Sequence, residues 1–126
     1  MIAKRLLQFN LLVSLFIAVT FIFTPGSILS LYGIKGDTPF YVISRYFGAT
    51  HIAFATLLWL ALRTNDTRFL RIIVVSFFAG DLTGTLVLFF AQLRGAMNTM
   101  GWIFVFLSLL FTVGYGYCTL KKLPEV

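Results

Sequence analysis

Charged side chains are scarce in this sequence of 126 residues. They make up 11% of the chain, whereas hydrophobic residues make up 60%. A typical soluble domain carries about 25% charged residues. A small soluble fold cannot bury this much apolar surface, because its surface is large relative to its volume. We therefore expect residues 1–126 to form a single membrane domain, with lipid as part of its solvent.

The sequence also lacks the usual signs of catalysis and cofactor binding. Cys118 is the only cysteine, which excludes an intrachain disulfide and a CxxC redox pair, and we interpret it as a small buried apolar residue. His51 is the only histidine, which excludes a histidine-rich metal site. No Walker loop, HExxH, GxSxG or GxGxxG motif occurs. The sequence favours a protein that is not an enzyme and holds no metal or cofactor, while an enzyme working entirely within the bilayer stays an open alternative.

What the chain does contain is four long apolar segments separated by short connections. They cover residues 6–24, 40–62, 69–93 and 101–120. Each has roughly the 20 residues that a membrane-spanning helix needs, and each is too long and too uniformly apolar for a strand of a β-barrel. Because short connections join antiparallel neighbours, the sequence predicts an all-α fold with four transmembrane helices in an up-down bundle. We expect the first segment to be retained rather than cleaved as a signal peptide, since no convincing cleavage site follows it.

Basic residues are distributed unevenly between the two ends of such a bundle. One end would hold both termini and the connection after the second segment, with Lys4, Arg5, Arg63, Arg68, Arg71, Lys121 and Lys122. The other end holds Lys35 and Arg94, with Arg45 just inside the second segment. Basic connections stay in the cytoplasm, so the sequence predicts a multi-pass protein with both termini cytoplasmic. This topology accounts for the net charge of +6 without nucleic acid as a partner.

Three ionisable residues lie within the apolar segments, namely Arg45, His51 and Asp81. Such residues usually face the bundle interior, pair with one another or mark a pathway. His51 and Asp81 lie near the midpoints of neighbouring antiparallel segments, so they are expected at similar depth. Thr85 and Gln92 extend the Asp81 side of the third segment outward. We predict that these five residues form an intramembrane polar cluster, in which Asp81 pairs with His51 or Arg45.

Small residues accompany the polar ones on two predicted helix faces. At about 100° per residue, Gly48 shares a face with His51, and Gly80 and Gly84 share a face with Asp81. Because glycines let helices approach closely in a membrane, we interpret all three as helix-packing residues. A further set of polar residues is expected to hydrogen-bond between helices: Asn10, Ser14, Ser108, Thr112 and Tyr115.

Three stretches carry a family resemblance: TPGSILSLYGI at 24–34, SRYFGATHIAFATLLWLALR at 44–63 and NTMGWIFVFLSLLFTVGYGY at 98–117. Arg45, Gly48, Trp59 and Arg63 carry most of it. In these stretches the chain resembles small four-helix bacterial inner-membrane proteins of the DoxX-like kind. The resemblance implies a four-helix bundle in a bacterial inner membrane, and it implies no particular activity.

The function predicted from these features is that of a small integral membrane protein without enzymatic activity. We expect a subunit or accessory protein that acts through helix packing in the lipid bilayer, within a larger membrane complex or a homo-oligomer. The main alternative is a proton-linked transporter or a small-molecule or lipid-binding protein that uses Asp81, His51 and Arg45. A third possibility is a redox partner that binds quinone or lipid among aromatic side chains.

Overall fold

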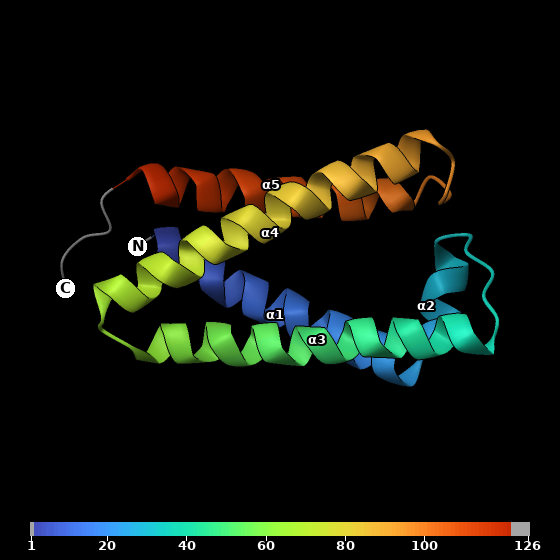
Figure 1. Ribbon diagram of the computed structural model, residues 1–126, viewed down its shortest axis with the longest axis horizontal. Helices are drawn as coiled ribbons and strands as arrows, with labels where there is room; N and C mark the ends of the chain where they lie inside the picture. The colour runs from blue at the N-terminus through green and yellow to red at the C-terminus, as the bar shows by residue number, and fades with distance from the viewer. Residues whose placement is uncertain (1, 122–126) are drawn as a thin grey trace.

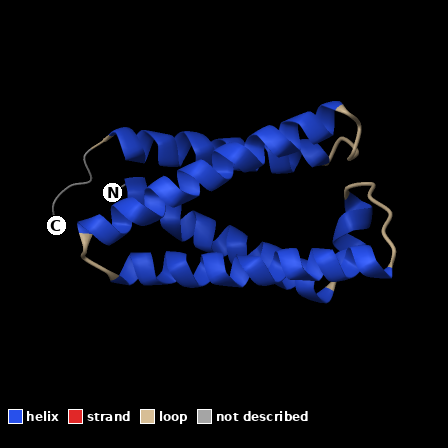
Figure 2. Cartoon of the chain, viewed as in Figure 1, coloured by secondary structure: helices blue, strands red, loops and turns tan. Residues whose placement is uncertain are grey.

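The chain is helical along most of its length. The computed structural model describes residues 2–121 and contains five helices in that range. They are α1 (Ile2–Phe23), α2 (Pro25–Leu31), α3 (Thr38–Arg63), α4 (Thr67–Leu93) and α5 (Gly101–Leu120). Figure 2 shows these helices joined only by loops and turns. The all-α prediction is confirmed, and α2 is an additional short helix inside the first predicted connection.

Local sequence signals set the helix boundaries. Pro25 occupies the first turn of α2, where its missing N–H needs no acceptor. The Asp37 and Asp66 carboxylates accept hydrogen bonds from backbone N–H groups in the first turns of α3 and α4. Gly33 and Gly95 follow α2 and α4 with φ angles of 73° and 75°, which glycine adopts without steric strain. The long helices therefore begin and end close to the predicted positions.

The four long helices form two pairs. In Figure 1, α1 lies along α3 and α4 lies along α5, and the pairs are closest at the end that holds both chain termini. The main hydrophobic core lies between the pairs and draws on all four long helices: Leu7, Leu58, Ala61, Leu70, Ile73, Val74, Phe111, Tyr115 and Cys118. Cys118 is buried, as predicted. Towards the α2 end the pairs diverge (Figure 1), and this divergence creates the site described below.

Three helices within residues 2–121 are long and apolar enough to cross a membrane: α1, α4 and α5. Their outward side chains are large and hydrophobic, and Phe16, Val87 and Phe106 are each more than 60% exposed. Lipid solvates such a surface, whereas water does not, so this pattern is that of a membrane protein. α3 is the least apolar of the long helices, and its mean hydropathy is lower than that expected of a membrane-spanning helix.

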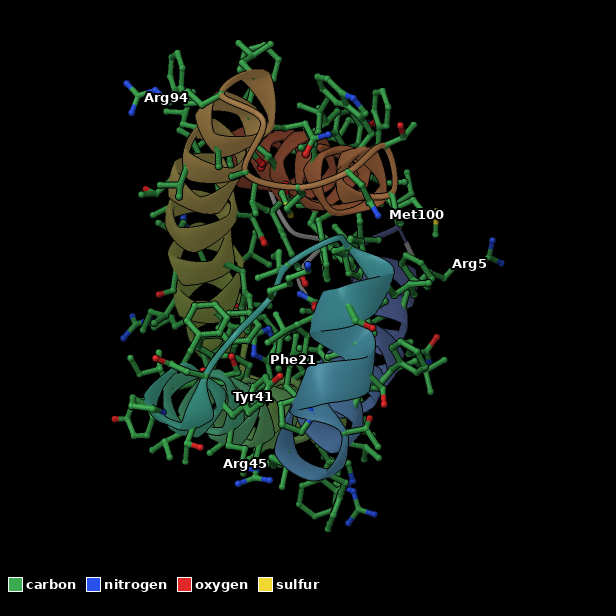
Figure 3. The ribbon with its side chains drawn as sticks, turned by 90° about the vertical axis from the view of Figure 1, so that its right-hand side faces the viewer. Arg5, Phe21, Tyr41, Arg45, Arg94 and Met100 are labelled. Atoms are coloured by element: carbon green, nitrogen blue, oxygen red, sulfur yellow. The ribbon has the colours of Figure 1, made fainter. Side chains whose placement is uncertain are left out.

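α2 connects the two helix pairs at the end where they diverge. The Tyr32 ring packs on Phe104 of α5 with ring centroids 4.3 Å apart. The backbone N–H of Asn98, in the α4–α5 connection, donates to the Tyr32 carbonyl oxygen at 2.9 Å. Its side-chain amide donates to the Leu31 carbonyl oxygen, also at 2.9 Å. Figure 3 looks onto this end and shows α2 in front of the bundle.

Candidate functional site

A cavity of about 360 Å³ lies between the two helix pairs and is lined by residues of α1, α3, α4 and α5. Small-molecule sites commonly measure about 300–1,000 Å³, so the cavity is large enough for a small ligand. Most of its wall is apolar and includes five phenylalanines: Phe47, Phe54, Phe77, Phe104 and Phe111. Six polar residues complete the wall: Asn10, Ser14, His51, Ser76, Asp81 and Ser108.

Asp81 presents a carboxyl group without a partner to this cavity. Its Oδ2 atom is buried and has no hydrogen bond within the described part of the chain. The helical period brings Phe77, Gly80, Gly84 and Leu88 to the same face of α4, and all four also line the cavity. The predicted shared face of α4 is therefore correct, and it faces the cavity.

His51 reaches the same cavity from α3. Its Nδ1 atom lies 3.0 Å from the Phe47 carbonyl oxygen, one turn earlier in the helix. A carbonyl oxygen only accepts, so Nδ1 carries the hydrogen, and Nε2 is an acceptor in the neutral imidazole. The ring also makes edge contacts with Phe47 and Phe54, at centroid distances of 4.5 and 5.2 Å. His51 and Asp81 thus share a cavity, but His51 Nδ1 bonds to Phe47 and Asp81 Oδ2 has no partner within residues 2–121, so neither atom makes the predicted direct bond.

Arg45 and Gln92 do not belong to this site. Arg45 is exposed and points outward in Figure 3. The step of six positions from Arg45 to His51 turns the helix by about 600°, which places Arg45 on another face. Gln92 lies about three turns beyond Asp81, where its amide donates to the Asn98 carbonyl oxygen at 2.9 Å. The prediction that these two residues join an Asp81 cluster is wrong.

Thr85 contributes to the α4–α5 interface beside the cavity. Its hydroxyl donates to the Asp81 carbonyl oxygen at 2.7 Å. It also lies 3.1 Å from Ser108 Oγ and 3.0 Å from Thr112 Oγ1. Thr85 therefore lies one turn beyond Asp81 on α4, and its contacts with the two α5 hydroxyls help to hold these helices together.

The three predicted packing glycines have different surroundings. A Cβ atom on Gly48 would lie 3.0 Å from side-chain atoms of Phe21 and Ile22, so this glycine does allow close packing of α3 on α1. A Cβ atom on Gly80 or Gly84 would meet no atom of the described chain within 4 Å. Within this chain the packing interpretation is thus wrong for Gly80 and Gly84, which line the cavity instead.

A hydrogen-bonded group on α1 and α5 forms another part of the wall. The Asn10 amide donates to the Tyr115 hydroxyl at 2.7 Å, and Ser14 donates to Asn10 Oδ1 at 3.2 Å. The predicted interhelical bond is confirmed for Asn10 and Tyr115, whereas Ser14 bonds within α1. Ser76 was not singled out from the sequence, although its place one turn before Gly80 on α4 is a signal for it.

The site combines an apolar cavity with a few polar groups. Within residues 2–121, no group of three or more histidine, cysteine, aspartate or glutamate residues is positioned to hold a metal ion.

Comparison with protein-family models, curated proteins and solved structures gave no match for this chain.

Proposed function

We propose that the protein crosses a bacterial inner membrane four times, with both termini in the cytoplasm. The fourth span would be α3, which packs along α1 and presents Val42, Ile43 and Ile52 outward. The α3–α4 connection lies at the same end as both termini (Figure 1), and Arg63 and Arg68 flank it. Basic residues gathered at one end support a cytoplasmic location for that end.

Two single-cysteine variants test this topology. In a Cys118→Ser background, Lys35→Cys and Asn65→Cys place thiols at opposite ends of the bundle. A membrane-impermeant maleimide should label Lys35→Cys in intact spheroplasts and Asn65→Cys only in inverted vesicles. Labelling of both variants from the same side would contradict four spans.

We further propose that the protein is a non-enzymatic binding protein that holds a small lipophilic molecule in the cavity. The observation that carries this proposal is the unpartnered Asp81 Oδ2 atom on an otherwise apolar wall. A buried polar group without a hydrogen bond destabilises the folded protein by about 1–3 kcal/mol. A ligand that hydrogen-bonds to this group recovers that free energy on binding. The ligand's apolar part would replace lipid or water against the phenylalanine side chains.

Purification in mild detergent, followed by mass spectrometry of extracted small molecules, tests this binding role. Wild-type protein should retain a lipophilic molecule in a fixed ratio to protein. Gly84→Phe should lose it, because the new ring would occupy space that no atom fills now. Leu86→Phe provides the matched control on the outward face of α4, where the native side chain is 51% exposed. Equal retention by both variants, or no retained molecule in the wild type, would refute the proposal.

A role as an accessory subunit is the second candidate, and one observation favours it. The face of α4 around Gly80 and Gly84 has no covering side chain from the described part of this chain. A helix of another subunit, or of a second copy, would fit against these glycines. A protein partner that co-purifies and protects Gly80→Cys from maleimide would establish this role. Undiminished labelling in the native membrane would exclude a partner on this face.

A further inference from the structure

Resting on the binding role proposed above, we infer that the cavity selects a lipophilic amine, with its ammonium group at Asp81 and its hydrocarbon chain among the phenylalanines. Most donors of the polar wall are already used within the protein, the wall carries a carboxyl group without a basic partner, and it is uncovered on one side. These three features are independent, and each restricts the class of ligand.

Most hydrogen-bond donors on the polar wall are already used within the protein. Ser14 donates its hydroxyl hydrogen to Asn10, and the Asn10 amide donates to Tyr115. Ser108 donates to the Val105 carbonyl oxygen at 3.0 Å. Acceptors remain, because Asp81 Oδ2 is unpartnered and His51 uses its Nδ1 hydrogen on its own helix. A ligand head that donates several hydrogen bonds fits this wall, and an ammonium group has up to three donors.

Charge points to the same class of ligand. Asp81 is the only carboxylate among the residues that line the cavity, and none of those residues is lysine or arginine. Arg45 is exposed on another face, so it does not balance the Asp81 charge. The faces of aromatic rings attract cations, and five phenylalanines line the wall. A neutral alcohol would supply one donor but no charge, and a fatty acid would bring a second carboxylate to Asp81.

The uncovered side of α4 accommodates the hydrocarbon chain. Gly80 is exposed, and in the part of the chain that the structure describes neither Gly80 nor Gly84 has a neighbour within 4 Å of the Cβ position. Leu57 of α3 and Leu88 of α4 continue the apolar wall on either side. An amine dissolved in the bilayer therefore reaches Asp81 between α3 and α4 without breaking the core at the opposite end.

Three probes with the same hydrocarbon chain test the inference: decylamine, decanol and decanoate. Their binding to the protein in nanodiscs of zwitterionic lipid is measured by equilibrium dialysis, with partition into empty nanodiscs subtracted. We expect decylamine to bind at least about tenfold more tightly than decanol, since a charge-assisted hydrogen bond is about twice as strong as a neutral one. Decanoate should bind most weakly of the three.

Variants identify the group responsible for this preference. Asp81→Asn, which removes the charge with little change of shape, should bring decylamine to the affinity of decanol. Asp37→Asn is the matched control, because it removes an exposed carboxylate and asparagine caps a helix as well as aspartate does. It should bind decylamine as the wild type does. Circular dichroism and thermal unfolding check that each variant is folded.

The results separate failure of the inference from failure of the binding role. If the wild type binds decylamine and decanol equally tightly, the amine preference is overturned. If Gly84→Phe then abolishes binding of both probes, the cavity is still a site for lipophilic molecules. Unchanged decylamine binding in Asp81→Asn would likewise overturn the role of the carboxylate. If no probe binds, the amine inference fails, and the retention experiment on native extracts decides the binding role independently.

Discussion

Alanine substitutions at Gly48 and Gly84 should differ in their effect on stability. Both residues lie inside long helices, where replacing glycine by alanine stabilises by roughly 1 kcal/mol through helix propensity. At Gly84 a new methyl group meets no neighbouring atom of residues 2–121 within 4 Å, so only this gain applies. At Gly48 the methyl group would lie 3.0 Å from Phe21 Cβ and 3.1 Å from the Ala18 carbonyl oxygen. Carbon atoms prefer separations of about 3.5–4.0 Å, so α1 and α3 must move apart.

The size of the difference follows from these contacts. Overpacking of a well-packed interface costs about 1–3 kcal/mol. The propensity gain is common to both variants and cancels when they are compared. Gly48→Ala should therefore be about 1–3 kcal/mol less stable than Gly84→Ala. Because the Ala18 oxygen belongs to the backbone of α1, it has less freedom to move than the tip of a side chain would have.

Equilibrium unfolding by SDS in mixed micelles, followed by circular dichroism, measures this difference. Wild type and both variants are compared at one lipid composition, and the slope of the transition checks that the unfolded state has not changed. Gly80→Ala serves as a second open-site variant and should behave as Gly84→Ala does. Equal stability of Gly48→Ala and Gly84→Ala, or a loss of stability at Gly84, would refute the assignment of tight and open sites.

Three further predictions concern polar and capping contacts. A double-mutant cycle of Asn10→Ala and Tyr115→Phe should give a coupling of about 0.6–1.7 kcal/mol in SDS unfolding, and additive effects would argue against their hydrogen bond. Gly33→Ala should destabilise, because its φ is 73° and its Cβ would lie 3.2 Å from Asn98; unchanged unfolding would contradict this. Burial raises the pKa of Tyr32 above its usual value of about 10. The neutral phenol is thus favoured by folding, and stability is lost as pH rises above about 10. Tyr32→Phe should lose less stability between about pH 9 and 11, and an identical pH profile would oppose this.

The helices themselves were predictable because their signals are local. Uniform apolarity over about 20 residues, with proline or aspartate at the boundaries, indicates a helix wherever the segment lies in the fold. The short helix α2 was missed because its 7 residues are too few to establish a period. Its position depends on contacts with Phe104 and Asn98, which are distant in the sequence.

The candidate site was predictable only in part. Helical periodicity correctly put Asp81 on one face with Gly80 and Gly84, because that relation depends on about 100° per residue alone. The same reasoning took Gly80 and Gly84 for packing residues, and it offered Arg45 as one of two possible partners of Asp81. Periodicity states which residues share a face, but it carries no information about the distance to the next helix.

The sequence by itself determined a helical, strongly apolar chain with one carboxylate and one histidine in the middle of neighbouring segments. Only the tertiary structure decided that α1 pairs with α3 and α4 with α5, and that the pairs diverge around Asp81. The physical reason is that lipid is as apolar as a protein core, so hydrophobicity does not separate the side chains that face lipid from those that face another helix. Packing makes that distinction, and here it leaves Asp81 facing a cavity rather than a partner side chain.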